Sequence, residues 1–586
     1  MYLQMRIVRS IAIVSLLCLL LTGCSGRKGV VSLRIIATTD VHGQIFDKDI
    51  LDGQERQGSL AKLASFLKKQ RKENKNVLYL DAGDILQGSI EIYQDVTAQY
   101  DRKSLAAEAY NMLGCDAVSF GNHDFAVGVS CYERFCVGTT FPILGSNVCF
   151  EDYGDFVPAY RMFEFNGLRV AVLGMTTPVT KYSIPSDRIS ELEFRDIVET
   201  AGYIVPRLRE DKKADVIIGL IHSGFDKGRM DDEGVYENAV RRMVSEVAGF
   251  DVIFFGHDHA PRCVKMTDCN GDTVLLINPG PYARNAAVAT VTADFRNSDK
   301  PEILTSGYLE DITDEVADKG FMKELSEWYV DVSNYADSVV GTITTSLEGR
   351  GVLWRESSAM DYIHSVQMAF SSAEISLASP VFTRSYIPAG DIRMRDLFAL
   401  YQYENTMVSV MLKGSEVRDV LEYSAGLYYN TVQDANGNLI KTGRDEGNGK
   451  KMPSTPSNYF ITAAGIDYEV DVTKPEGERV RILSMNDGKP FDPDRYYRTT
   501  INSFLYGGTE SALFKVDGLS HKEIMGRLKV SSSTDLRYNL ITGFALKRLI
   551  GKEVEVSKAC NWRLVPEDIV EGCLARDTID FYVINE

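Results

Sequence analysis

The chain has 586 residues, more than one hydrophobic core can organise, so we expect two domains and a connector. Its hydrophobic content of 44% and charged content of 25% are those of ordinary globular proteins. The formal net charge of −18, without a basic stripe to offset it, excludes nucleic-acid polymers as partners. A small anionic substrate remains compatible with this charge where bound cations dominate the local field.

The N-terminus predicts export. Arg6 and Arg9 precede an apolar run over 11–21 that is too short to span a bilayer comfortably. Small residues then lead into Cys24, a pattern that resembles the bacterial lipoprotein box, in which this Cys is lipidated. We therefore expect a signal peptide over 1–24 and an exported cell-envelope lipoprotein, held to the membrane by its lipid and facing the periplasm or the cell surface. The alternative is an ordinary cleaved signal with a chance Cys.

Strands and helices alternate through the first half of the mature chain. The expected strands are 33–37, 77–80, 115–120, 168–173, 216–221 and 252–255, and the expected helices are 58–72 and 104–113. This alternation indicates an α/β domain with much parallel pairing. Five short motifs follow these strands at their carboxyl ends, where open α/β sheets form their sites.

The five motifs contain five of the seven histidines of the chain, together with Asp and Asn. Their candidate donors are Asp40, His42, Asp84, Asn122, His123, His222, His257 and His259. Imidazole and carboxylate groups together suit Zn, Mn, Fe and similar divalent ions, and eight donors are too many for one ion. One such motif alone is more often a turn or a helix cap, but five together favour a two-metal centre. We expect Asp81 and Asp124 to be structural, and His364 and His521 to be ordinary core or surface histidines.

Two metal ions roughly 3.5–4 Å apart can supply a nucleophile at neutral pH and hold a phosphoryl group for in-line displacement. A bridging carboxylate is needed to hold two cations at that separation. A His outside the coordination sphere can protonate the leaving alkoxide or stabilise the transition state.

The motifs D-x-H, GD, GNHD, H-S-G and GH-x-H, in this order over residues 40–259, resemble those of the calcineurin-like metallophosphoesterases. The resemblance implies a four-layer αββα domain over 25–312 and two divalent ions, with Zn, Mn or Co as the expected metals. It implies that one ion is held by Asp40, His42, Asp84 and His259, and the other by Asp84, Asn122, His222 and His257. Asp84 would then bridge the ions, and His123 would be the catalytic histidine.

Residues 313–340 predict a connector helix, because apolar residues from Val316 to Val332 recur near helical spacing.

Residues 341–586 contain no second ligand cluster. Four stretches there, 387–392, 400–405, 464–468 and 502–508, resemble the secreted 5'-nucleotidase group and, within it, the bacterial 2',3'-cyclic-nucleotide 2'-phosphodiesterase/3'-nucleotidases. The resemblance implies an α+β substrate-binding domain that grips the nucleotide base between aromatic rings. The implied residues are Tyr403, paired with Phe504 or Tyr506, and Asn405. The alternative is that the three aromatic rings belong to the core.

Two departures weaken a strict 5'-nucleotidase interpretation. Ala126 stands where many 5'-nucleotidases have an Asp that supports the catalytic His, and the Gly-Gly-x-Arg stretch of that branch is missing. The main hypothesis is an exported hydrolase that converts 2',3'-cyclic nucleotides to 3'-nucleotides and then to nucleosides. The alternatives are a 5'-nucleotidase or UDP-sugar diphosphatase, and a surface lipoprotein that binds nucleotides without turnover.

Some features are left open by the sequence. Arg384, Arg393 and Arg395 are candidate phosphate contacts or simple surface charges. The cysteines allow local disulfides, at 131–136, 263–269 and 560–573, or free thiols. The metal identity, the preferred base and the oligomeric state are not specified.

Overall fold

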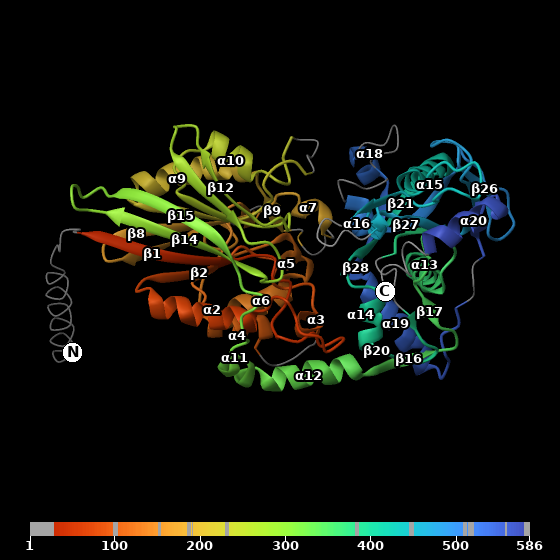
Figure 1. Ribbon diagram of the computed structural model, residues 1–586, viewed down its shortest axis with the longest axis horizontal. Helices are drawn as coiled ribbons and strands as arrows, with labels where there is room; N and C mark the ends of the chain where they lie inside the picture. Colours follow the sequence, from red (N-terminus) through yellow and green to blue (C-terminus); the bar gives the residue numbers. More distant parts are fainter. Residues whose placement is uncertain are drawn as a thin grey trace, which may run out of the picture.

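The computed structural model describes residues 29–97, 103–150, 154–184, 189, 191–228, 234–380, 386–444, 451–507, 513, 521–556 and 560–578. These residues form two lobes, and helix α12 (Ser326–Asp337) runs along one edge between them (Figure 1). The predicted signal peptide with Cys24, as well as Arg384, lies outside the described residues. Within the described ranges, no helix combines the length and the apolar character that crossing a bilayer requires.

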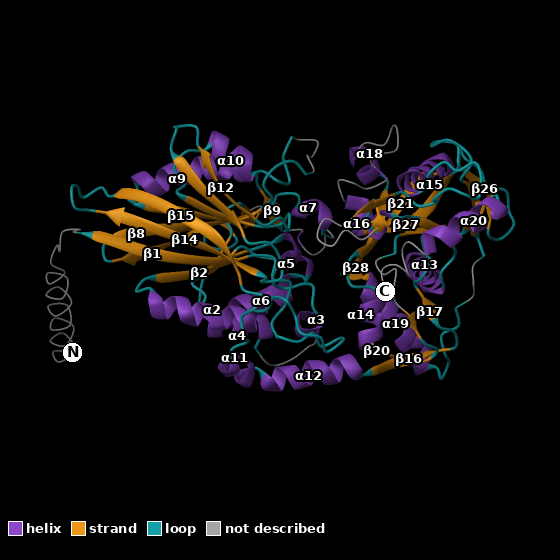
Figure 2. Cartoon of the chain, viewed as in Figure 1, coloured by secondary structure: helices purple, strands orange, loops and turns teal. Residues whose placement is uncertain are grey.

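The first lobe is built on two six-stranded sheets (Figure 2). In one, the strand order is β15 (Glu302–Asp311), β14 (Asn285–Asp294), β1 (Val30–Thr38), β2 (Val77–Asp81), β3 (Ala117–Ser119) and β4 (Ile143–Leu144). In the other, it is β12 (Arg262–Thr267), β13 (Thr273–Asn278), β11 (Val252–Phe255), β10 (Val216–His222), β8 (Leu168–Thr176) and β7 (Tyr160–Phe165). The six strands expected from the sequence are all present.

Alternation along the strands explains the layering. Ile35 of β1 belongs to the core between the two sheets, whereas Ile36 packs with the helices α2 (Leu60–Glu73) and α4 (Leu105–Leu113). On the second sheet, Val172 faces the inter-sheet core and Ala171 packs with α9 (Ile197–Glu210) and α10 (Val240–Glu246). Strands buried on both faces read as continuous apolar runs. The predicted four-layer αββα fold is confirmed.

Helix α4 has clear end signals. The Ser104 hydroxyl accepts a hydrogen bond from the amide of Ala107, and Gly114 ends the helix in the left-handed conformation at φ 61°. The helix therefore begins and ends where the sequence pattern placed it.

Parallel pairing gathers the motif-bearing loops. Strand β1 pairs in parallel with β2, β2 with β3, and β10 with both β8 and β11. Because parallel strands share a direction, their carboxyl ends lie at the same edge of a sheet. In both sheets this edge points towards the second lobe (Figure 1).

The connector is two helices rather than one. Helix α11 (Lys319–Glu324) and α12 are separated at Leu325, and Phe321, Leu325 and Val332 are buried. Val316 is 75% exposed and precedes both helices, so it is not part of the apolar face as predicted. The limits 25–312, 313–340 and 341–586 stay predictions.

The second lobe has one five-stranded sheet in the order β24 (Thr462–Ala464), β18 (Ile375–Ala378), β27 (Tyr496–Asn502), β21 (Thr406–Lys413) and β28 (Leu528–Asp535). A smaller sheet has the order β26 (Val480–Met485), β25 (Ile466–Asp471) and β29 (Trp562–Val565). Helices α13 (Ser358–Ser371), α15 (Gly414–Tyr428) and α19 (Leu536–Leu549) contribute to the same core. This is the predicted α+β arrangement.

Two smaller expectations concern the core. His364 is buried on α13, and its ring nitrogens lie 2.8 Å from Ser376 Oγ and 3.0 Å from Thr462 Oγ1, so it is a structural core histidine as expected. The side chain of His521 lies outside the described residues. The candidate disulfides are not formed, since Cys136, Cys263, Cys269 and Cys573 are free thiols.

Candidate metal centre

The backbone is strained where the donors lie. Asp40, His42, Asp84, His257 and His259 all adopt left-handed conformations, with φ angles of 50°, 48°, 61°, 79° and 53°. Such conformations are uncommon for residues other than glycine and cost on the order of 1–3 kcal/mol each. Five of them in one cluster indicate that the donor geometry, rather than backbone preference, determines these loops.

Two glycines allow the loops to approach each other. A Cβ on Gly121 would lie 2.0 Å from Oδ1 of Asp84, and a Cβ on Gly256 would lie 1.9 Å from Thr39 Oγ1. Any side chain at these positions would push the loops apart. The glycines of the GNHD and GH-x-H motifs are therefore needed for the close approach of backbone to carboxylate.

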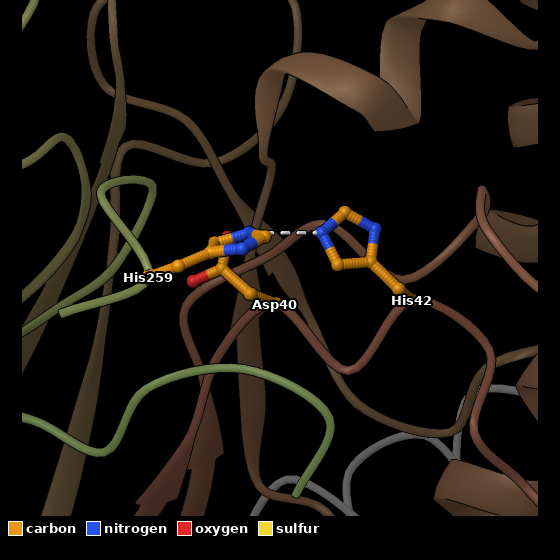
Figure 3. A group of neighbouring side chains, drawn as sticks. All are labelled: Asp40, His42 and His259. Carbon is orange, nitrogen blue, oxygen red and sulfur yellow. Dashed lines mark hydrogen bonds and ion pairs between the residues drawn. The ribbon is translucent and has the colours of Figure 1, made fainter. Parts of the chain in front are cut away.

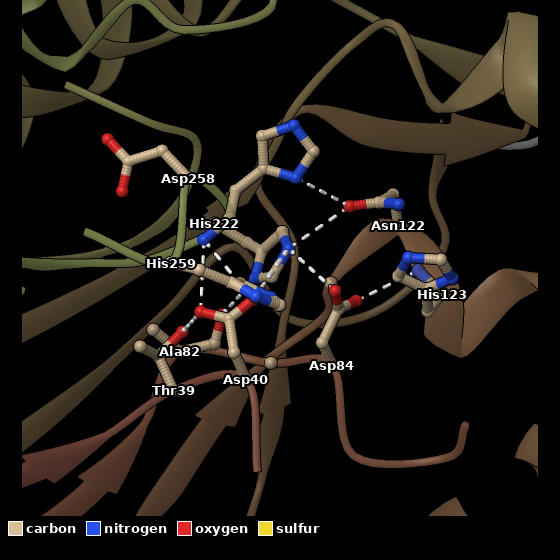
Figure 4. Close-up of polar contacts among 12 residues, drawn as sticks. Thr39, Asp40, Ala82, Asp84, Asn122, His123, His222, Asp258 and His259 are labelled. Carbon is tan, nitrogen blue, oxygen red and sulfur yellow. Dashed lines mark hydrogen bonds and ion pairs between the residues drawn. The ribbon is translucent and has the colours of Figure 1, made fainter. Parts of the chain in front are cut away.

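The first group of donors surrounds Asp84. His222 Nε2 lies 3.2 Å from Asp84 Oδ2, 3.1 Å from Asn122 Oδ1 and 4.0 Å from Asp40 Oδ1. His257 Nδ1 lies 2.8 Å from the same Asn122 oxygen. Figure 4 shows Asp40, Asp84, Asn122 and His222 turned towards one another.

The second group is Asp40, His42 and His259, drawn in Figure 3. His259 Nε2 lies 3.3 Å from Asp40 Oδ1 and 3.2 Å from His42 Nε2, while His42 Nε2 lies 3.9 Å from Asp84 Oδ2. Asp84 thus lies within reach of donors from both groups, as a bridge requires. Asp40 also reaches both, because it is close to His222 as well. The assignment of each donor to one ion stays a prediction.

Hydrogen bonds from the Nδ1 atoms of two histidines show whether the donor set suits metal ions. Nδ1 of His222 is 2.9 Å from the carbonyl oxygen of Ala82, and Nδ1 of His42 is 3.1 Å from that of Gln87. A carbonyl can only accept, so Nδ1 carries a hydrogen, and in the neutral ring it is Nε2 that turns a lone pair towards the cluster. Lone pairs of nitrogen and oxygen then converge around two buried carboxylates. A divalent cation satisfies this donor set.

The electrostatics of the cluster favour positive charge at its centre, which is supplied either by a proton on His222 or by a metal ion that displaces it. Burial favours the neutral form of His222, but the nearby carboxylates, Asp84 first, outweigh it and raise the pKa of His222 to about 10. Burial also opposes ionisation of Asp84, yet His222 and His123 hold its pKa well below the usual range. The carboxylates therefore stay ionised, as metal ligands must.

His123 lies beside the donors. Its amide nitrogen donates a 2.8 Å hydrogen bond to Asp84 Oδ1, and its ring centroid is 5.5 Å from that of His42. Burial lowers the pKa of His123 to about 4, although Asp84 favours its charged form. Asp124 of the same short helix α5 (Asn122–Ala126) accepts from the amides of Gly121 and Ile85, which confirms its structural role.

Asp81 also has the predicted structural role. Its carboxylate accepts hydrogen bonds from the amide of Gly83 at 2.9 Å and from the hydroxyls of Thr38 at 2.6 Å and Tyr110 at 2.9 Å. It holds the turn that leads to Asp84 rather than facing the metals.

Two residues near the centre were not found from the sequence. Glu237 Oε1 lies 3.1 Å from His257 Nε2, so it orients that ring with Nδ1 towards Asn122. Tyr282, with φ 65°, places its ring 5.8 Å from that of His42 and 6.0 Å from that of His259. Neither lies in a recognisable motif.

The predicted substrate residues occupy different environments. Tyr403 is 51% exposed, and Phe504 on the short helix α16 (Ser503–Gly507) is half-buried beside the ring of Tyr459. Tyr506 is only 4% exposed and packs in the core, so little of its ring is open to a base. Of the two rings proposed to pair with Tyr403, Phe504 is the one with open surface. The Asn405 amide donates to Tyr401 Oη at 3.1 Å.

Tyr403 of the second lobe acts electrostatically on Tyr282 of the first. Burial, followed by the nearby phenol of Tyr403, raises the pKa of Tyr282. Arg395, by contrast, is paired at 2.8 Å with Asp337 of the connector, and Arg393 lies 3.7 Å from the same carboxylate. These two arginines join the second lobe to the connector, which leaves little reason to assign them to phosphate.

Comparisons with known proteins agree with this geometry. Residues 33–261 match the calcineurin-like phosphoesterase family, and residues 339–516 match the 5'-nucleotidase C-terminal domain. The fold and the donor cluster define a metal-dependent phosphoric ester hydrolase. The chain combines a calcineurin-like phosphoesterase domain with a 5'-nucleotidase C-terminal domain, the composition of a nucleotide phosphohydrolase.

Individual relatives are distant in sequence. The chain is 25% identical to the trifunctional nucleotide phosphoesterase protein YfkN of Bacillus subtilis, across 82% of this chain but only 36% of that protein. It is also 25% identical to a 2',3'-cyclic-nucleotide 2'-phosphodiesterase/3'-nucleotidase of Salmonella typhimurium, across 93% of this chain and 91% of the relative. A candidate 5'-nucleotidase structure from Staphylococcus aureus has the same fold, with a TM-score of 0.70, 17% identity, and coverage of 91% and 100%.

Proposed function

We propose that the protein is an exported nucleotidase that opens 2',3'-cyclic nucleotides to 3'-nucleotides and then releases nucleoside and phosphate. The observation that carries this proposal is the cluster of Asp and His donors in the first lobe, accompanied by the exposed ring of Tyr403 in the second lobe. A phosphoryl group at the donors would leave the nucleoside beside an exposed aromatic ring. Relatives with this pair of activities in their names, at 25% and 26% identity, support the choice.

Two divalent ions, when bound, supply a nucleophile at neutral pH and stabilise the charge of the phosphoryl oxygens. Asp40, His42, Asp84, Asn122, His222, His257 and His259 are the residues proposed to hold them. His123 acts beside them: its ring protonates the leaving ribose oxygen or stabilises the charge that develops there. The bond from its amide to Asp84 fixes the position of its Cα relative to the bridging carboxylate.

The same residues can serve both reactions. A cyclic diester and a 3'-monoester each need an oxygen nucleophile in line with the leaving ribose oxygen. The nucleotide shifts between the two steps, while the donors and His123 stay in place. Tyr403 and Phe504, with Asn405 supporting the loop, are proposed to hold the base during both.

Export and anchoring form part of the proposal. The N-terminal pattern ending at Cys24 supports a lipoprotein of the cell envelope. Labelling cells with a fatty-acid analogue should mark the wild-type protein and leave the Cys24→Ser variant unmarked. Labelling of both proteins alike, or of neither, would contradict the anchor.

A substrate panel tests the reaction. The purified protein should be assayed with 2',3'-cyclic AMP, 3'-AMP, 5'-AMP and UDP-glucose at the same pH and metal concentration. We expect kcat/KM for the first two to exceed that for 5'-AMP by at least about tenfold, or about 1.4 kcal/mol of transition-state discrimination. A preference for 5'-AMP or UDP-glucose would support the 5'-nucleotidase or UDP-sugar diphosphatase alternative. Nucleotide binding without turnover in the presence of metals would support the non-catalytic lipoprotein.

A further inference from the structure

Arg537 is buried where the two lobes meet. It lies in the first turn of α19, and none of its surface is exposed. A buried guanidinium loses its hydration, so a protein keeps one only where other groups compensate for that loss. The rings and hydrogen-bond acceptors around Arg537 replace the lost hydration, and they come from both lobes.

Two aromatic rings enclose the guanidinium, one from each lobe. Its Cζ lies 3.9 Å from the ring centroid of Phe398 on α14 (Met394–Leu400) and 4.6 Å from that of Tyr93 on α3 (Ile90–Thr97). The two rings also contact each other edge to face, with centroids 5.1 Å apart. The ring planes are 84° apart, so the guanidinium lies in the corner that the two rings form, and Lys has no planar group to pack there. Arg537 therefore bridges the metal-binding lobe and the second lobe.

The polar side of Arg537 contacts residues 401–405, which we call the recognition loop because it contains Tyr403. Nη2 of Arg537 lies 3.1 Å from Glu404 Oε1 and 3.3 Å from the carbonyl oxygen of Gln402. The preceding residue, Leu536, donates its amide to the carbonyl of Asn405 at 2.7 Å. The first turn of α19 is thus hydrogen-bonded to the loop on both sides of Tyr403.

We infer that Arg537 is a positioning residue that fixes the recognition loop relative to the metal centre, and so sets where the nucleoside lies when its phosphate is at the donors. This inference rests on the proposed function. Tyr403 is exposed at the tip of this loop, and Tyr93 lies on the helix that follows Gln87, whose carbonyl oxygen is 3.1 Å from Nδ1 of the metal-site residue His42. A reacting group misplaced by about 1 Å can cost on the order of 10²-fold in rate.

The position of the loop matters only for substrates that reach it. A nucleotide spans from the donors to Tyr403, whereas p-nitrophenyl phosphate has no nucleoside to place. Loss of Arg537 should therefore separate the two substrates. A residue that only stabilised the fold would affect both equally.

The test compares Arg537→Met, which keeps length but loses charge and planarity, with Arg537→Lys, which keeps charge alone. Tyr93→Leu removes the ring contributed by the other lobe, and Tyr93→Phe retains it. Lys547→Met, at an exposed position of the same helix, is the matched control. We expect Arg537→Met, Arg537→Lys and Tyr93→Leu to raise KM for the preferred nucleotide at least tenfold. Their kcat/KM for p-nitrophenyl phosphate should stay within twofold of wild type, and Tyr93→Phe and Lys547→Met should match wild type on both substrates.

Metal content by elemental analysis and a thermal unfolding scan accompany each variant. Equal losses on both substrates, or no change on either, would overturn the inference. If Arg537→Met fails to fold, Tyr93→Leu and Arg537→Lys decide the matter. The wild-type panel tests the proposed function separately. If wild type binds nucleotides without turnover, the same variants are compared by calorimetric Kd for that nucleotide, and an unchanged Kd would overturn the inference.

Discussion

The amide of His123 donates a hydrogen bond of 2.8 Å to Asp84 Oδ1, which ties the candidate catalytic histidine to the candidate bridging carboxylate. The other carboxylate oxygen of Asp84 lies 3.2 Å from His222 Nε2. A change at Asp84 therefore disturbs both proposed metal positions and the backbone of His123. A change at the His123 side chain leaves this hydrogen bond intact. The two residues can accordingly be separated by experiment.

Asp84→Ala should be the most damaging substitution among the donors. It removes the carboxylate that lies within reach of both donor groups, so the bound metal should fall from two ions towards none. The loss of metal stabilisation corresponds to several kcal/mol, on the order of 10³-fold or more in kcat/KM. Elemental analysis and phosphate release measure the two effects, with Asp52→Ala, at an exposed position, as control. Two retained ions would show that Asp84 is not a bridge.

Removal of metal should abolish phosphate release. The donor set has seven proposed ligands, and the nucleophile depends on the ions they hold. Dialysis against a chelator, followed by titration with Mn, Co or Zn, should first eliminate and then restore activity. Full activity in a sample verified as metal-free would contradict the two-metal mechanism.

His123→Asn should reduce kcat by on the order of 10²–10⁴, the usual scale of acid–base assistance. The side chain lies beside the donors rather than among them, so the variant should retain both metals. Elemental analysis of wild type and variant, prepared in parallel, provides the check. Loss of metal would identify His123 as a ligand.

Glu237→Gln should weaken metal binding. The carboxylate lies 3.1 Å from His257 Nε2, and substitutions of such supporting groups typically cost about 10–100-fold in metal affinity or activity. Competition with a chromophoric chelator measures the affinity, and Glu237→Asp should recover part of it. Asp226→Asn is the control, because Asp226 lies with Glu237 in the segment between β10 and α10. An affinity within twofold of wild type would show that Glu237 does not orient His257.

The aromatic residues of the second lobe should divide into two kinds. Tyr403→Ala and Phe504→Ala should raise KM for nucleotides far more than KM for p-nitrophenyl phosphate. Tyr506→Ala should instead lower stability by about 3–5 kcal/mol, because it empties a core position. Kinetics with both substrates and urea unfolding distinguish these outcomes. A selective nucleotide defect in a stable Tyr506→Ala protein would restore Tyr506 to the base site.

Acid should destabilise the second lobe through His364. Burial lowers the pKa of His364 to about 3, whereas an exposed His titrates near 6.5. Between these values the unfolded state binds the proton more tightly, so stability falls as the pH drops from about 6.5 towards 3. The stability difference between pH 7 and pH 5, from urea unfolding, should be smaller in His364→Gln than in wild type. Equal differences would contradict this assignment.

Local patterns in the sequence were sufficient to predict the metal-binding lobe. Each donor lies at the carboxyl end of a strand or shortly after it, and parallel strands bring these ends to the same edge of the sheet. Phe504 and Tyr506 illustrate where such patterns fail. They are two residues apart on a short helix, so they point to different sides, and the sequence does not say which side is open. Glu237 and Arg537 were missed because their contacts arise from chain segments far apart in sequence.

The left-handed conformations of the donor loops have a consequence for mutational tolerance. Asn and Gly adopt positive φ readily, so the backbone should accommodate either at positions 40, 42, 84, 257 and 259, although neither replaces the carboxylate or imidazole that is lost. β-branched residues at these positions would both increase the backbone strain and remove the ligand. In a saturation library sorted first for folded protein and then for turnover, these five positions should accept Asn and Gly in the first sort and almost nothing but the present residue in the second. Five strained backbone conformations of this domain thus coincide with positions whose side chains are proposed to hold the metal ions.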